Sequence, residues 1–165
     1  SEAMTTADRM AVLDHGILQQ VGSAATLFDF PVNRFVAGFV GTTNLVDGQI
    51  TAIDADRVTF QAESLGSLTL RRASEVSQTG PSTLGFRPHT VSLCKPQEPQ
   101  EAGKLWLRGQ VESCEFLGES SRYRVRVGQA SLIAHQAHFS GAGLHDVGTE
   151  VALGIDPEQV RLLAH

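Results

Sequence analysis

Two stretches in the C-terminal three quarters of the chain share one pattern: Gly85-Phe-Arg-Pro-His-Thr-Val-Ser-Leu93 and Gly154-Ile-Asp-Pro-Glu-Gln-Val-Arg-Leu162. Each runs glycine, apolar, charged, proline, two polar residues, valine, polar, leucine. Proline fixes φ and removes a backbone donor where a strand leaves its ladder, and Val-x-Leu resumes the alternation of a strand. The pattern predicts a duplicated unit. The alternative is a chance match between strand ends, where glycine and proline are common.

A second match lies upstream of each stretch and supports the duplication. Gly48-Gln-Ile50 and Gly109-Gln-Val111 correspond at a somewhat shorter spacing, as expected if one loop had grown. Alternating runs bounded by turn residues predict strands at 45–53, 57–62, 67–72, 84–93, 105–116, 121–127, 130–136, 150–155 and 159–163. We expect a mainly β protein with two tandem small barrels, each of about five strands.

The chain divides into three predicted parts. Residues 1–41 contain helix-type segments and a hairpin around Asp14-His-Gly16, with Ser23 as a helix cap and Pro31 as a helix stop. The β region, 42–165, is split by the polar connector 95–104, which has two prolines and no large apolar residue. The barrel halves are therefore predicted at about 42–94 and 105–165.

Composition limits the function classes. The 165 residues carry a formal net charge of −5 without a basic stripe, which argues against a nucleic-acid partner. No run of eighteen apolar residues predicts a membrane span, and no export signal precedes the first helix-type segment. Cys94 and Cys114 each lie in an apolar run, where a structural free thiol is expected.

Motifs for catalysis are missing from this sequence. It has no phosphate-binding Gly-x-x-x-x-Gly-Lys-Ser/Thr loop, no Gly-x-Ser-x-Gly, no Cys-x-x-Cys and no His-Glu-x-x-His. His135 and His138, with His145 nearby, could supply imidazoles to a metal, but strand alternation sends the first two to opposite faces. The same divergence separates Glu112 from Glu115, so we predict neither an enzyme nor a metal site.

Arg122, Arg124 and Arg126 alternate with Tyr123, Val125 and Val127. This pattern predicts a strand with a solvated arginine face and a packed inner face. A second interpretation is a surface for an anionic ligand or an acidic partner, because arginine presents a rigid fork of donors to oxyanions.

The N-terminal part of the sequence resembles a known family. Ser1-Glu-Ala-Met-Thr-Thr-Ala-Asp-Arg-Met10, continuing through Gly16 to Gly22, resembles the segment that follows the switch histidine in ABC importer ATPases. The linker of such ATPases resembles Leu27-Phe-Asp-Phe-Pro31 through Gly41, followed by Asn44. Gly85-Phe-Arg-Pro88 resembles the Gly-x-Arg-Pro-Glu signature of the TOBE domain, with His89 where the family usually has glutamate.

The resemblance implies a fold and a role. Residues 1–41 would be the end of an ATPase domain with linker helices, and 42–165 a TOBE-type domain of two OB-like barrels. The function implied is regulation and dimerisation of the ATP-binding subunit of a bacterial ABC importer of the polyamine, iron, phosphonate or sugar type, with polyamine as the first expected solute. The Walker motifs would precede Ser1. ATP and magnesium would therefore belong to the parent subunit, and this segment would have no cofactor and no ATPase activity of its own.

Partners and location follow from the same resemblance. They are a second copy of the ATPase subunit, the permease subunits through the preceding domain, and a small solute or oxyanion, in a complex at the cytoplasmic face of the membrane. Candidate ligand or dimer contacts are Arg87, His89, Gly118, Glu119, Arg122 and Arg124.

Two other functions remain open from the sequence: a free-standing oxyanion or small-solute binder built from the duplicated barrels, and an oligonucleotide binder, which the acidic charge disfavours. The resemblance to ABC importer ATPases implies that Met10–Leu13 and Ile17–Val21 belong to a larger sheet in the parent subunit, so we expect unprotected apolar faces there. Swapping, self-association or disorder of residues 1–22 is the predicted consequence.

Overall fold

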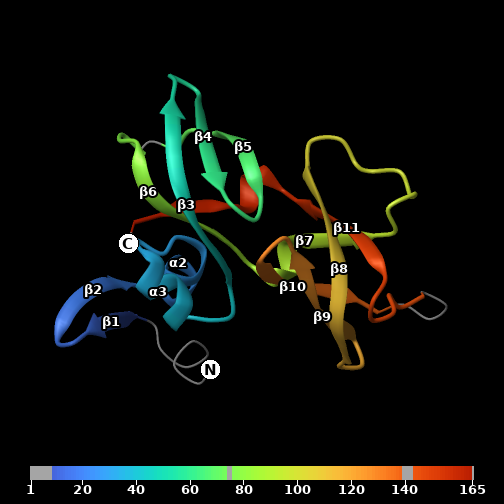
Figure 1. The fold of residues 1–165 in the computed structure, drawn as a ribbon. Helices are drawn as coiled ribbons and strands as arrows, with labels where there is room; N and C mark the ends of the chain where they lie inside the picture. The colour runs from blue at the N-terminus through green and yellow to red at the C-terminus, as the bar shows by residue number, and fades with distance from the viewer. Residues whose placement is uncertain (1–8, 74–75, 139–142, 165) are drawn as a thin grey trace.

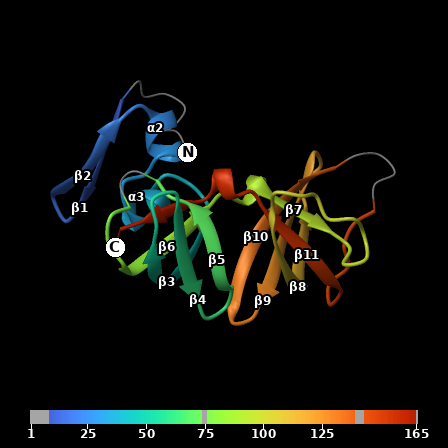
Figure 2. The same cartoon turned by 90° about the horizontal axis from the view of Figure 1, so that it is seen from above.

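The computed structural model describes residues 9–73, 76–138 and 143–164. These residues form a two-stranded hairpin, two short α-helices and two five-stranded antiparallel sheets. Figure 1 shows the hairpin and helices at one end of the molecule, and Figure 2 shows the helical part, the first sheet and the second sheet following one another. The predicted mainly β class with small barrel-like units is confirmed.

The N-terminal hairpin pairs β1 (Met10–Asp14) with β2 (Ile17–Gly22). His15 and Gly16 form the turn, both with positive φ, at 50° and 79°. Two successive left-handed residues match the twist of a tight hairpin, and glycine adopts this conformation without a Cβ penalty. The predicted hairpin at this place is therefore confirmed.

Two six-residue helices follow, α2 (Ala24–Asp29) and α3 (Arg34–Phe39). The Ser23 hydroxyl accepts a hydrogen bond from the Thr26 amide at 3.1 Å, and the Asn33 side chain accepts from the Val36 amide at 2.9 Å. Each cap satisfies an amide that has no partner inside the first turn. Within the described residues, no helix is long and apolar enough to cross a bilayer.

The outer face of the hairpin carries exposed apolar side chains. On this face Leu13, Leu18 and Val21 are between 46 and 57% exposed, whereas Val12 on the opposite face is buried against the two helices. Ile17, beside the turn, is 66% exposed. The predicted unprotected apolar face is therefore present on one side of the hairpin. Swapping or self-association remains a prediction, and residues 1–8 lie outside the described residues.

The first sheet has the strand order β12-β6-β3-β4-β5, and the second has the order β10-β9-β8-β11-β7. The strands of the first are β3 (Asn44–Ile53), β4 (Arg57–Ala62), β5 (Gly66–Arg71), β6 (Gly80–Phe86) and β12 (Arg161–Leu163). The strands of the second are β7 (Val91–Cys94), β8 (Leu105–Phe116), β9 (Ser120–Val127), β10 (Ala130–Ala137) and β11 (Glu150–Ile155).

Each half of the β region gives its last strand to the sheet of the other half. β7 follows β6 in sequence but pairs with β11, and β12 follows β11 but pairs with β6. The predicted halves 42–94 and 105–165 are therefore not the spatial units, although no strand lies between β7 and β8, where the connector 95–104 was expected. The reason is that each proline turn carries the chain from one sheet to the other.

Those turns also correct two predicted strands. The predicted strand 84–93 is divided by the 3-10 helix η1 (Pro88–Thr90), and the predicted strand 159–163 begins only after η2 (Pro157–Gln159). Proline at the first position of each turn cannot donate to a ladder, so the ladder ends there.

The two sheets repeat one another in detail, which supports the duplication. The register of β3 with β4 shifts between Ile50 and Ala52, and that of β8 with β9 shifts between Val111 and Ser113, at corresponding positions. Close packing surrounds the matching glycines. A Cβ at Gly48 would meet the carbonyl oxygen of Gln61, and one at Gly109 would lie 2.7 Å from that of Arg126. Bulges and glycines of this kind bend a strand around a small barrel.

A single hydrophobic cluster fills the space inside both sheets. It includes Phe60 and Leu84 of the first sheet and Tyr123 and Leu153 of the second, each at most 1% exposed. A separate small cluster lies under the helices. Because its small core is separate, the helical part needs other contacts to hold it against the sheets.

Cys94 and Cys114 are free and half-buried.

Candidate functional site

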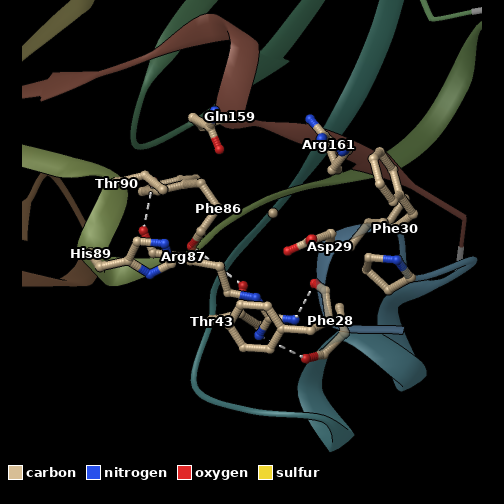
Figure 3. Close-up of a pocket in the computed structure, with 14 residues that line it drawn as sticks. Phe28, Asp29, Phe30, Thr43, Phe86, Arg87, His89, Thr90, Gln159 and Arg161 are labelled. Carbon is tan, nitrogen blue, oxygen red and sulfur yellow. Dashed lines mark hydrogen bonds between the residues drawn. The ribbon is translucent and has the colours of Figure 1, made fainter. Parts of the chain in front are cut away.

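Arg87 joins the two helices to the first sheet. It lies at the end of β6, directly before Pro88, and only 9% of it is exposed. Its Nη1 donates to the carbonyl oxygens of Ala37, Gly41 and Thr42 at 3.2–3.3 Å, and its Nη2 donates to that of Phe28 at 2.9 Å. Figure 3 shows the guanidinium of Arg87 beside Phe28. One side chain therefore contacts the last turns of both helices and the segment that leads into β3.

The charge of Arg87 suits this position. Neither α2 nor α3 has a basic residue in its last turn, so the carbonyl groups there have no positive side chain of their own. A cation at the C-terminal end of a helix interacts favourably with those carbonyls and with the helix dipole. Arg87 supplies that cation from another element, which a sequence reading of the helices alone does not reveal.

The ring of Phe28 completes the environment of Arg87. The Arg87 Cζ lies 3.9 Å from the ring centroid, a cation–π distance, and His89 stacks on the same ring at 6.4 Å between centroids. Burial lowers the pKa of the Arg87 guanidinium, and the nearby Asp29 carboxylate acts in the opposite direction. A buried cation with four carbonyl acceptors is costly to disturb, because removing it leaves polar groups without partners.

The C-terminal strand makes a second tie to the helices. The amide of Arg34, at the start of α3, donates to the carbonyl oxygen of Ala164 at 2.9 Å, and Asn33 forms a parallel bridge with Ala164. The guanidinium of Arg34 also lies 3.1 Å from the Asp47 carboxylate on β3. Figure 1 shows the C-terminus beside the helical part. Helix α3 is therefore fixed at both its beginning and its end.

Asn44 ties the first sheet to the second. Its side-chain nitrogen donates to the carbonyl oxygen of Ile133 at 2.8 Å, and its side-chain oxygen accepts from the amide of Ile133 at 2.7 Å. The side chain thus replaces a neighbouring strand at the edge of β10, and it is 4% exposed. Edge strands need such cover for their unpaired backbone groups.

A pocket of about 210 Å³ opens beside Arg87. Figure 3 shows its three sides: Phe28, Asp29 and Phe30 from α2 and its cap, His89 and Thr90 from η1, and Gln159 with Arg161 from η2 and β12. Parts far apart in sequence therefore meet here. The pocket combines aromatic walls with charged and polar groups, which is the usual make-up of a small-molecule site.

The arginine strand has the predicted faces. Tyr123, Val125 and Val127 are buried, while Arg124 and Arg126 are exposed and Arg122 is half-buried. On the outer face, Arg126 lies 2.6 Å from the Glu112 carboxylate, which also accepts from the Ser131 hydroxyl at 2.6 Å. These two hydrogen bonds, that of Ser131 first, lower the pKa of Glu112. Arg122 and Arg124 line a shallow hollow with Ser113 and Glu115, and whether it holds a ligand stays a prediction.

Gly118 and Glu119 form the turn between β8 and β9. Gly118 has a φ of 90°, and the Glu119 carbonyl oxygen accepts from the amide of His138 at 2.8 Å. Both residues are exposed. Of the six candidate contacts, only Arg87 and His89 line the pocket at the junction, so the structure does not bring the six together.

The histidines contact separate rings. His138 packs edge-on against Phe116 at 4.9 Å, and His145 against Tyr123 at 5.5 Å. Burial lowers the pKa of His135 and of His145. Among the described residues, no three His, Cys, Asp or Glu side chains lie together as a set of metal ligands.

The comparison with protein families matches residues 84–163, from β6 to β12, to the TOBE domain. These residues form a TOBE domain. The match contains both proline turns and both exchanged strands, and Arg87 stands at the first of those turns. The resemblance noted at Gly85-Phe-Arg-Pro88 is therefore confirmed. His89, the departure from that signature, lies exposed on the Phe28 ring.

Curated relatives extend the similarity beyond the TOBE domain. The spermidine/putrescine import ATP-binding protein PotA of Rubrobacter xylanophilus is 31% identical over 98% of this chain and 42% of its own length. The putrescine transport ATP-binding protein PotG of Escherichia coli is 30% identical over 92% and 41%, and the maltose/maltodextrin import ATP-binding protein MalK of Salmonella typhimurium is 30% identical over 98% and 42%. The chain thus spans about two fifths of the length of these importer ATP-binding subunits.

A solved structure shares the fold of most of this chain. The cytoplasmic molybdate-binding protein ModG superposes with a TM-score of 0.63 over 74% of this chain and 96% of its own, at 15% identity. At that identity the likeness shows the fold alone. A free-standing oxyanion-binding protein, the alternative left open by the sequence, is not favoured, because the relatives found over most of the chain are importer ATP-binding subunits.

Proposed function

We propose that this chain is the C-terminal regulatory and dimerisation part of the ATP-binding subunit of a bacterial ABC importer. In this proposal, catalysis by ATP and magnesium belongs to the part of the parent subunit that the chain does not contain. The TOBE domain pairs with that of a second copy, and the parent subunit contacts the permease subunits at the cytoplasmic face of the membrane.

The observation that carries this proposal is the Arg87 junction. The relatives align with the hairpin and helices as well as with the TOBE domain, so the two parts occur together in importer ATP-binding subunits. Here Arg87 holds the last turns of both helices and the segment that leads into β3 through four carbonyl oxygens. A regulatory domain needs a stiff connection to the part that it regulates, because coupling requires that a change on one side alters the free energy of the other.

The exposed face of the hairpin supports the same proposal. Leu13 and Leu18 are cross-strand partners and present apolar side chains next to one another, with Val21 further along the same face of the small two-stranded sheet. Isolated hairpins are marginally stable, and exposed apolar faces of this kind mark interaction sites. In the parent subunit, the remaining ATPase domain would cover this face.

Polyamine is the proposed solute, on the names of PotA and PotG among the relatives. MalK aligns at nearly the same identity, so identity alone does not distinguish the solute class. Growth of a strain that lacks the parent gene, with spermidine, putrescine or maltose as the limiting solute, would test this part. Loss of uptake of maltose but not of polyamines would contradict it.

The proposal is tested by the parent subunit carrying Arg87→Gln. We expect this subunit to bind ATP with the wild-type affinity. Its ATPase rate should no longer respond to the TOBE domain and should equal the rate of a subunit truncated after Gly41. Asp156→Asn, at the corresponding turn, is the matched control and should keep the wild-type rate. If removal of residues 42–165 leaves both the ATPase rate and the dimer mass unchanged, the domain neither regulates nor dimerises.

A further inference from the structure

The pocket beside Arg87 contains a charged group that the fold leaves without a carboxylate partner. Arg161, half-buried on β12, donates from Nη1 to the carbonyl oxygens of Glu158 and Val160 at 3.1 and 2.9 Å, and its Cζ lies 5.0 Å from the Phe30 ring centroid. No ion pair within the described residues involves Arg161, and its Nε and Nη2 have no hydrogen-bond acceptor there. Its guanidinium therefore keeps a fork of donors for an external group.

The other charges of the pocket nearly cancel. Arg87 donates its hydrogen bonds to backbone carbonyls. The Asp29 carboxylate lies close enough to affect the pKa of Arg87, and its negative charge offsets the positive charge of Arg87. One positive charge, that of Arg161, is then left over. The Gln159 amide and the His89 ring also line the pocket, and neither side chain donates or accepts a hydrogen bond within the described residues.

The apolar walls argue against a cationic ligand. An ammonium group would seek the face of an aromatic ring, but Arg87 already lies over Phe28 and Arg161 over Phe30. A cation would also face two guanidinium groups against the single carboxylate of Asp29. An anion with a small apolar body fits the pocket better. Its charged group can accept hydrogen bonds from the unused donors of Arg161 and Gln159, and its apolar body can pack against the edges of the Phe28 and Phe30 rings.

We propose that this pocket binds a small organic anion whose single carboxylate or phosphate group is held by Arg161, with the apolar body against Phe28 and Phe30. At about 210 Å³ the pocket accommodates a molecule of only a few heavy atoms. Such a ligand contacts α2, η1 and β12 at once, so it braces the helices against the TOBE domain. In the regulatory role proposed above, on which this consequence rests, the anion would stiffen the connection to the ATPase domain. The binding itself does not depend on that role.

The test is an amide NMR titration of the 165-residue chain with three probes: butyrate, inorganic phosphate and butylammonium. Butyrate should shift amides of residues 28–30, 86–90 and 159–161 in a saturable manner and raise the melting temperature, because a ligand that binds only the folded state stabilises it. Stronger binding of phosphate than of butyrate would identify a phosphate-bearing ligand, and the reverse order a carboxylate with an apolar body. Either order supports the site.

Two variants and a control make the result specific. Arg161→Gln should weaken anion binding roughly tenfold or more, as expected for loss of a charge-assisted hydrogen bond. Asp29→Asn, at an exposed position, should strengthen it several-fold by removing the opposing charge. Arg57→Gln, an exposed arginine on β4, should change nothing. The proposal is overturned if no probe binds saturably, if butylammonium binds in preference to the anions, or if Asp29→Asn leaves anion affinity unchanged.

Discussion

The two proline turns, η1 and η2, have the same backbone structure, but the residue before the proline makes different contacts in each. At the first, Arg87 extends away from its own turn to the carbonyl groups of two helices. At the second, the corresponding residue is Asp156, whose carboxylate accepts from the amide of Glu158 at 2.9 Å and so caps its own 3-10 helix. In this duplicated fold, the first turn therefore contacts the helices, and the second turn contacts only itself through this side chain. The difference shows that the C-terminal ends of both helices are held by a side chain that only the first turn carries, while both sheets are built on the backbone pattern that the two turns share.

The largest expected effect comes from separating the two halves. Residues 1–94 and 105–165, produced as two polypeptides, should each be largely unfolded alone, because each sheet lacks the strand that the other half supplies. Mixed together, they should form a folded one-to-one complex with the circular dichroism spectrum of the intact chain. Either piece folding alone would show that strand exchange is not required.

Replacing Arg87 should give the next largest effect. Arg87→Gln removes a buried cation and leaves carbonyl oxygens of both helices without their donor, so we expect a loss of about 3 kcal/mol in the free energy of unfolding. Asp156→Ala should cost about 1 kcal/mol, the usual value of a capping hydrogen bond. Urea unfolding of both variants measures the difference, and equal losses would contradict the contrast between the turns.

Gly48 and Gly109, the matching glycines that precede the register shifts in β3 and β8, should have a somewhat smaller effect on stability when replaced. Gly109→Ala places a Cβ against the Arg126 carbonyl oxygen and the Val125 side chain, so we expect a loss of about 2 kcal/mol. Gly143→Ala, where a Cβ meets no atom within 4 Å, is the matched control and should stay within about 0.5 kcal/mol of the wild type. Thermal unfolding checks both, and a harmless Gly109→Ala would mean that the strands separate freely there.

The smallest expected effect concerns the outer face of the second sheet. The pKa of Glu112 is lowered in the folded chain, so this carboxylate contributes stability above its unfolded pKa, and the contribution is lost as the pH falls through the folded pKa. Ser131→Ala should raise the pKa of Glu112 toward its ordinary value, and Arg124→Gln should change it less. Side-chain NMR titration measures both shifts. A larger effect of Arg124→Gln would show that charge, not the hydroxyl, controls this group.

Much of this fold was predictable because local patterns determine it. Glycine and proline at corresponding places revealed the duplication, and alternation gave the arginine strand its two faces. The exchange of β7 and β12 was not predictable, since a strand that follows its turn pairs equally well with either sheet as far as its own sequence is concerned. The partner is chosen by packing across the whole core.

The candidate site was predicted only in part. Arg87 and His89 were recognised through a family signature, but the acceptors of Arg87 lie about fifty residues away in sequence. Phe28, Asp29 and Arg161 carry no motif of their own. The available signal was the lack of a basic residue in the last turn of either helix, which implies that a cation comes from elsewhere without saying from where.

The most direct test of the central claim, that Arg87 joins the linker helices to the TOBE domain, is hydrogen exchange of individual amides in Arg87→Gln. We predict that protection is lost in α2 and α3 while β3, β8 and β11 keep wild-type protection, because the sheets have their own core. Unchanged protection of the helices, or an equal loss across the helices and both sheets, would contradict it.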